Sequence, residues 1–165
     1  DFIAPPMVAN DAPTVVVAVI DTDRGELACT LDPEHAPHAV ANFRRLAEKH
    51  FYDGLTFHRV IPGFIIQGGD PHGDGTGGPG YEFADEIVPV LHFDRPGVLA
   101  MANRGPNTNG SQFYITDGRA QYLESHQTIF GMCGNTDVIH AIATAPRDAR
   151  DRPLEPVVIR SIYIR

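Results

Sequence analysis

Short apolar, β-branched runs separated by turns limit the fold of this chain more than any other feature. The sequence contains 16 glycines and 14 prolines, many of them between these runs. The runs predict eight strands, at residues 14–21, 26–31, 56–60, 63–68, 97–102, 111–116, 128–133 and 157–164. Because the strands follow one another and do not alternate with helices, a parallel sheet of β-α-β units is disfavoured.

Two helical patterns complete the predicted fold. One covers residues 37–49 and has a proline in its first turn, where proline is well tolerated. A shorter one covers residues 137–143, with Asn135 or Thr136 as its cap. We therefore expect a mainly β fold, a closed eight-stranded antiparallel β-barrel capped by two α-helices. Closure is expected because it removes exposed strand edges.

The length and composition are those of a single domain. At 165 residues and 18.0 kDa, with 42% hydrophobic residues, the chain can bury a substantial core. Residues 1–13 contain three prolines and show no periodicity, so we expect an N-terminal tail there and a folded domain over 14–165. The tail is either left by processing or added in expression. Processing would slightly favour export, periplasmic or secreted, over a cytoplasmic location.

The charge and the cysteines exclude several partner classes. A net charge of −8 argues against nucleic acid as a main partner. No apolar run approaches the length of about 18 residues that a membrane span needs. We also expect the protein to be a monomer. Cys29 and Cys133 lack metal-binding or CxxC spacing and fall in predicted strands. We interpret them as small buried apolar residues, while a disulfide between them stays open.

Other chemistries find little support in the sequence. The glycines of residues 73–78 are not followed by a helical pattern, as a phosphate-binding loop requires. His35 and His38 form a pair without a nearby third ligand, and no Gly-x-Ser-x-Gly elbow marks a hydrolase. We therefore expect no metal site, no organic cofactor and no acyl transfer.

Polar side chains embedded in apolar strands are the main functional signal. Arg59, Gln67, Asn103 and Gln112 lie in or beside such strands. Burying groups of this kind without partners costs free energy, so several together indicate a polar site on an apolar wall. The apolar residues near them in the sequence are Phe64, Met101, Phe113, Tyr114 and Leu123. This combination predicts a groove that binds an extended peptide. His58 precedes Arg59 in the same strand, where it is expected to orient its neighbours.

The sequence also resembles a known family along most of its length. From residue 14 onward it contains Phe-His-Arg-Val at 57–60, Phe-Ile-Ile-Gln-Gly-Gly-Asp at 64–70, Gly-Thr-Gly-Gly at 75–78, Met-Ala-Asn at 101–103 and Asn-Thr-Asn-Gly-Ser-Gln-Phe at 107–113. In order and spacing these segments resemble the cyclophilin family of peptidyl-prolyl cis-trans isomerases, particularly the compact bacterial kind.

The resemblance implies an enzyme that isomerises Xaa-Pro bonds in peptides and unfolded proteins and so assists folding. By position, Arg59 would donate to the prolyl nitrogen, Gln67 would hold Arg59 or the substrate carbonyl, and Asn103 would bind the peptide backbone. Tyr114 matches the usual pocket phenylalanine, whereas its neighbour Phe113 is expected to face the core. The full set of implied substrate-binding residues is His58, Phe64, Ile65, Ala102, Gln112, Phe113, Tyr114, Tyr122, Leu123 and Gln127.

Two departures from the family pattern fall at the expected rim of the groove. Tyr122 stands where tryptophan is frequent, so cyclosporin-type inhibitors are expected to bind with reduced affinity. Gln127 stands where histidine is frequent, and a histidine appears one residue earlier, as His126. Strand alternation predicts that Gln127 points inward and His126 outward. The alternative to an enzyme is a proline-peptide binding or chaperone-like module with little turnover.

Overall fold

The computed structural model describes residues 15–120, 123 and 126–165. The predicted tail over 1–13 and Tyr122 lie outside the described residues. The elements in chain order are β1 (Val16–Thr22), β2 (Gly25–Leu31), α2 (Pro37–Glu48), β3 (Arg59–Ile61), β4 (Ile65–Gly68), β5 (Val98–Met101), β6 (Phe113–Thr116), β7 (Ile129–Cys133), α3 (Thr136–Ala143) and β8 (Ile159–Ile164). None of the described helices is long and apolar enough to cross a membrane.

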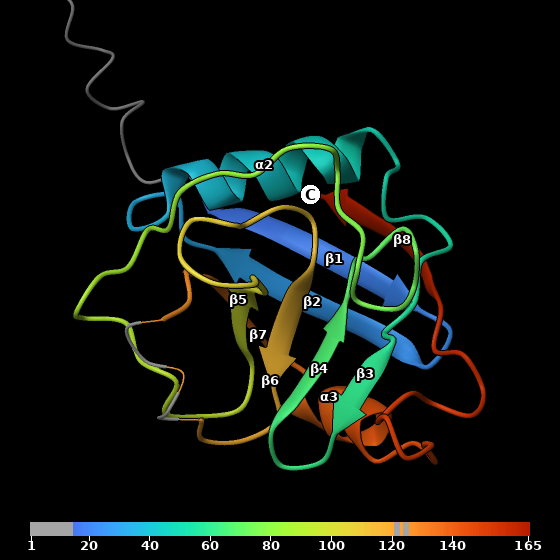
Figure 1. The fold of residues 1–165 in the computed structure, drawn as a ribbon. Coiled ribbons are helices and arrows are strands. Elements are labelled where there is room, and N and C mark those ends of the chain that lie inside the picture. Colours follow the sequence, from blue (N-terminus) through green and yellow to red (C-terminus); the bar gives the residue numbers. More distant parts are fainter. Residues whose placement is uncertain (1–14, 121–122, 124–125) are drawn as a thin grey trace, which may run out of the picture.

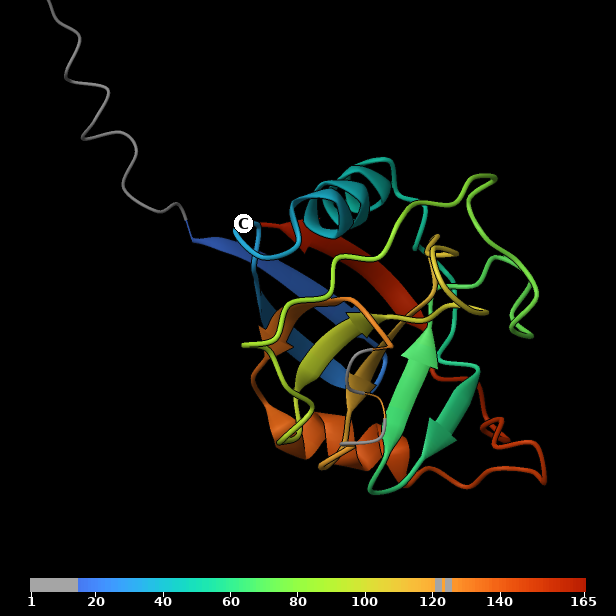
Figure 2. The same ribbon diagram turned by 60° about the vertical axis from the view of Figure 1, so that its left-hand side comes forward.

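The eight strands form one antiparallel sheet in the order β3-β4-β6-β5-β7-β2-β1-β8. The sheet curls around a core, with α2 and α3 at its opposite ends (Figures 1 and 2). The predicted closure is not confirmed, because β3 and β8 are the two ends of this order and share no ladder. An isolated bridge between Thr56 and Val158, and a hydrogen bond from the N–H of Phe57 to the Val157 carbonyl at 3.0 Å, join the segment before β3 to the segment before β8. The mainly β, two-helix architecture agrees with the prediction.

Helix α2 packs its apolar face on the sheet, and a distant loop caps it. The buried residues of this face are Ala39, Val40, Phe43, Leu46 and Ala47. The residue before the helix, Ala36, has no side chain that could cap the first turn. Instead, the Glu86 carboxylate accepts hydrogen bonds from the N–H groups of His38 and Ala39, at 3.0 and 2.9 Å. Since a helix N-terminus attracts negative charge, this contact ties the loop around Glu86 to α2.

The interior and the outer face of the sheet carry separate apolar clusters. Successive strand side chains alternate between the two faces, so Val60, Ile66 and Ile115 point into the main core. Their strand neighbours Ile65 and Tyr114 belong to a second cluster on the opposite face. The second cluster forms the wall on which the candidate site is built.

Cys29 and Cys133 form a disulfide, which corrects our interpretation of them as separate buried thiols. They are direct partners in the β2–β7 ladder, and 104 residues of sequence separate them. The interpretation failed because the sequence does not show that β2 and β7 are neighbours in the sheet. The cross-link lies within the main core.

Candidate active site

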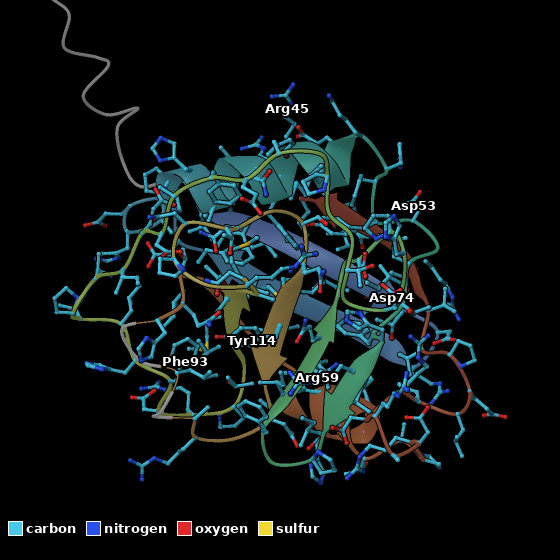
Figure 3. The ribbon with its side chains drawn as sticks, viewed as in Figure 1. Arg45, Asp53, Arg59, Asp74, Phe93 and Tyr114 are labelled. Atoms are coloured by element: carbon cyan, nitrogen blue, oxygen red, sulfur yellow. A yellow bond between two sulfur atoms is a disulfide. The ribbon has the colours of Figure 1, made fainter. Side chains whose placement is uncertain are left out.

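Three side chains on neighbouring strands form a row across the outer face of the sheet. Arg59 on β3 pairs with Gln67 on β4, which pairs with Tyr114 on β6, and Tyr114 pairs with Ala100 on β5. Residues paired in this way point to the same face of a sheet. Figure 3 shows Arg59 and Tyr114 on one face, with Phe93 beyond Tyr114. The ladder register therefore brings a cation, an amide and an aromatic ring into one line.

The apolar wall beside this row contains most of the predicted pocket residues. Phe64, Ile65, Tyr114 and Leu123 all belong to the outer cluster. Phe93 is buried there as well and stacks on Tyr114, with ring centroids 6.0 Å apart and the planes inclined by 25°. Sequence reasoning missed Phe93, because it lies in an irregular stretch without periodicity. The wall offers an apolar surface to a ligand that reaches Arg59.

A relay of hydrogen bonds fixes the polar part of the row. An Nη of Arg59 donates to Gln67 Oε1 at 3.3 Å, and Gln67 Nε2 donates to Gln112 Oε1 at 3.1 Å. Gln112 Nε2 donates in turn to the carbonyl oxygens of Gly75 and Gly77, at 3.1 and 2.9 Å. Because carbonyl oxygens only accept, they determine which end of each amide faces its neighbour. The relay therefore presents the Gln67 oxygen to Arg59.

The relay changes the role expected for Gln112. Both ends of its side-chain amide already have protein partners, and the residue is almost entirely buried. Gln112 therefore supports Gln67 from behind, and its amide is not free to hold substrate. The nearby N–H of Ala102 donates to the Gln112 carbonyl, at 3.0 Å, so the segment carrying Ala102 is also fixed by this residue.

Arg59 keeps most of its hydrogen-bonding capacity for a ligand. Its guanidinium is partly buried, and its partner in the described part of the chain is the neutral amide of Gln67. Within residues 15–120, 123 and 126–165, no carboxylate forms an ion pair with it. A guanidinium has five N–H donors and stays charged at any physiological pH. The site thus holds a positive donor beside an apolar wall without neutralising it.

Asn103 and Gln127 lie together at the other side of the groove. Gln127 Nε2 donates to Asn103 Oδ1, and Asn103 Nδ2 donates to the carbonyl oxygen of His126, both at 3.5 Å. The Gln127 side chain is half-buried, while His126 is exposed. The orientation predicted from strand alternation is therefore the one observed. Asn103 Oδ1 also accepts a hydrogen bond from the N–H of Gly105, at 3.3 Å.

Two predicted residues are buried. Phe113 is fully buried on the inner face of the sheet, where its ring centroid lies 5.4 Å from that of Phe43 and 5.6 Å from that of Tyr52. Its inclusion among the substrate-binding residues is wrong, because alternation turns it away from Tyr114. His58 is also buried, and this burial lowers the pKa of its imidazole. Burial therefore favours the neutral form of His58.

A cavity of about 350 Å³ lies between the relay and Asn103. Its wall includes Gln67, Ala102, Asn103 and Gln112, together with the glycine-rich loop over residues 75–80. The loop keeps this cavity open because glycines have no side chains to fill it. Sequence reasoning identified the loop as irregular and glycine-rich but did not place it against the polar residues.

One group of side chains in this loop has the composition of a metal site. Ligand atoms of Asp70, His72 and Asp74 lie within 4.8 Å of one another. The buried Asp70 carboxylate, however, accepts hydrogen bonds from the N–H groups of His72, Asp74 and Gly75. Its oxygens hold the loop in shape, so this group is explained by the local structure.

The fold and the site together define a class of protein. A groove with an apolar wall, an uncompensated arginine and a partly exposed asparagine suits an extended peptide with an apolar residue at its centre. These are the features of a peptidyl-prolyl isomerase.

Comparison with known proteins identifies the family. The family model for cyclophilin type peptidyl-prolyl cis-trans isomerases matches residues 17–164. A probable peptidyl-prolyl cis-trans isomerase A of Mycobacterium leprae is 48% identical over 99% of this chain and 97% of its own length. Peptidyl-prolyl cis-trans isomerase B of Streptomyces anulatus is 49% identical over 89% and 95%. The chain therefore belongs to the cyclophilin-type family and is a peptidyl-prolyl cis-trans isomerase.

Solved structures agree with this assignment. The crystal structure of a Cryptosporidium parvum cyclophilin type isomerase superimposes with a TM-score of 0.89 at 38% identity, covering 92% of this chain and 98% of that one. A second structure of the same protein, in the presence of the dipeptide Ala-Pro, gives a TM-score of 0.88 at 39% identity, over 90% and 98%.

Proposed function

We propose that Arg59 catalyses Xaa-Pro isomerisation by donating a hydrogen bond to the prolyl nitrogen as the amide twists. Rotation about an amide bond has a barrier of about 18–20 kcal/mol because resonance is lost. In the planar amide the nitrogen lone pair is delocalised, whereas in the twisted state it can accept a hydrogen bond. A donor placed there stabilises the transition state more than the ground state. The observation that carries this proposal is the Arg59–Gln67–Gln112 relay, which holds an unneutralised guanidinium at the edge of the apolar wall.

The apolar wall supplies the site for the proline ring. Phe64, Ile65, Tyr114 and Leu123 form this pocket, and Asn103 holds the peptide backbone on the far side of Arg59. The relative solved in the presence of Ala-Pro supports a proline-containing ligand. A protease-coupled assay on an Ala-Pro peptide tests the proposal directly. The protease cleaves only the trans form, so the cis form must isomerise before it is cleaved.

The rim of the groove gives a first prediction about residue roles. Gln127 contacts Asn103, whereas His126 is exposed. We expect His126→Ala to keep kcat/KM within about twofold, as surface substitutions usually have small effects. Gln127→Ala should cost more, because Asn103 loses a partner. A sharp loss in His126→Ala with Gln127→Ala near normal would reverse the two roles.

The same rim predicts a flat pH profile. Gln127 does not ionise, and burial lowers the pKa of His58 from its ordinary value of 6.5. The charged form of His58 is therefore disfavoured above pH 6.5, so kcat/KM should vary little between about pH 7 and 8. A profile with a step near pH 7 would show that a histidine contributes to turnover.

Cyclosporin should bind more weakly here than to family members with tryptophan at the rim. Tyr122 lies outside the described residues, so this expectation rests on the sequence alone. A tyrosine ring is smaller than an indole and carries its polar group at a different place. Tyr122→Trp should therefore tighten binding in calorimetry, with Tyr122→Phe as the control that keeps ring size. Unchanged or weaker binding by the tryptophan variant would contradict the prediction.

We also propose that the protein is exported and monomeric. The Cys29–Cys133 disulfide supports a periplasmic or secreted location, because disulfides persist in oxidising compartments. The net charge of −8 supports a protein that does not bind nucleic acid. Cell fractionation with an antibody tests the location, and sedimentation tests the monomer.

A further inference from the structure

A cavity of about 620 Å³ opens at the β3 end of the sheet, next to Arg59. Arg59 and Gln67 form one part of its wall, and the loop carrying Arg150 and Arg152 forms another. This loop is anchored beside β3 because the N–H of Val60 donates to the Asp151 carbonyl at 2.8 Å. Figure 2 shows the loop beside β3. A ligand on Arg59 therefore reaches this cavity without leaving the protein surface.

The positive charges of the cavity are not neutralised by ion pairs. Arg59, Arg150 and Arg152 all line it, and across the described residues none of the three pairs with a carboxylate. Arg147, two residues before the cavity-lining Ala149, differs in this respect. Its Nε lies 3.2 Å from the Asp151 carboxylate in an ion pair. The loop thus pairs one arginine and leaves two facing the cavity.

The two carboxylates that line the cavity are engaged with their own loops. Asp148 accepts hydrogen bonds from the N–H groups of Arg150 and Arg152, at 2.8 and 3.1 Å. Asp74 accepts from the N–H and the hydroxyl of Thr76, at 3.0 and 2.6 Å. These hydrogen bonds lower the pKa of both carboxyl groups, so both are ionised at neutral pH. Three cations and two anions leave a surplus of one positive charge in a chain whose net charge is −8.

The buried imidazole of His58 lines the same cavity as Arg59 and Arg152. Burial is the main cause that lowers its pKa, and the charges of Arg152 and Arg59 add to the effect, while Asp70 and Asp74 oppose it. The lowered pKa favours the neutral form of His58, so the arginines supply the positive charge of the cavity.

We propose that this cavity is a subsite for one acidic side chain of the substrate, an aspartate or glutamate within about three residues of the Xaa-Pro bond. Three extended residues span about 10 Å, enough to pass from the prolyl nitrogen at Arg59 into the cavity. A guanidinium binds carboxylate through two parallel hydrogen bonds. One carboxylate also balances the single surplus positive charge. The inference rests on Arg59 acting on the prolyl bond, and it defines which peptides this isomerase prefers.

The test compares matched peptides that carry Glu or Gln at each position from three before to three after an Ala-Pro unit. Isomerisation is followed by NMR exchange, so that no coupling protease adds its own preference. At one position we expect the Glu peptide to show about three- to fivefold higher kcat/KM than the Gln peptide, in the range of exposed charge pairs. This ratio should fall toward one as salt rises from about 0.05 to 0.5 M, because salt screens exposed charges.

Arginine variants test which residues cause the preference for the Glu peptide. Arg150→Gln and Arg152→Gln should each bring the Glu-to-Gln ratio toward one, whereas the ion-paired Arg147→Gln, the matched control, should keep both the ratio and the turnover. The loop should fold in all three variants, since Asp148 accepts hydrogen bonds from backbone N–H groups.

Equal rates for Glu and Gln peptides at every position would overturn the subsite while leaving the isomerase intact. Absence of turnover on every peptide would instead refute the role of Arg59. A phosphoserine peptide preferred over glutamate would replace carboxylate by phosphate as the ligand and so overturn the proposal as stated.

Discussion

Arg59→Ala should lower kcat/KM by about 10²–10³-fold, the usual cost of removing one preorganised donor from a transition state. Arg59 is partly buried and bonded only to Gln67 among the described residues, so its removal leaves no unpaired buried charge. The fold should therefore survive, with an unchanged circular dichroism spectrum. Protease-coupled kinetics on an Ala-Pro peptide measures the loss.

Arg59→Lys is the matched control for this experiment. Lysine keeps the charge but offers a single flexible ammonium in place of the rigid planar fork. We expect it to recover part of the activity and remain well below wild type. If Arg59→Ala keeps near-full turnover, the proposed mechanism is wrong. If it unfolds, Arg59 has a structural role.

The strand pattern of this chain could be predicted because each strand is short, β-branched and bounded by turns. Alternation also predicted that Gln127 points inward, and the family resemblance implied that Tyr114, with Phe113 turned to the core, faces the groove. These are local consequences of a two-residue period. They do not depend on which strands are neighbours.

The features that the sequence did not reveal depend on neighbours in space. Cys29 and Cys133 pair because β2 lies beside β7, and Phe93 stacks on Tyr114 although its own segment has no periodicity. The supporting role of Gln112 likewise depends on two carbonyl groups of a loop distant in sequence. Sheet order and loop placement decide all three, and a single sequence does not specify them.

Loss of the Cys29–Cys133 disulfide should lower the free energy of unfolding by about 2–4 kcal/mol, because a cross-link that closes a long loop restricts the unfolded chain. The two cysteines are 104 residues apart in the sequence, so the loop they close is most of the domain. In urea the unfolding midpoint should fall by about 1–2 M. Unfolding curves with and without a phosphine reductant measure this difference.

A double Cys29→Ala, Cys133→Ala variant separates the cross-link from core packing. The reduced wild type loses only the bond, whereas the variant also loses two sulfur atoms from a fully packed interior, so it should be the least stable of the three forms. The pair lies in the core between β2 and β7, away from Arg59 and the outer cluster, and turnover at low temperature should stay within about twofold in every form. Equal unfolding midpoints for the oxidised and reduced protein would show that the cross-link contributes no stability. Two free thiols found by mass spectrometry in protein purified without reductant would show that it does not form.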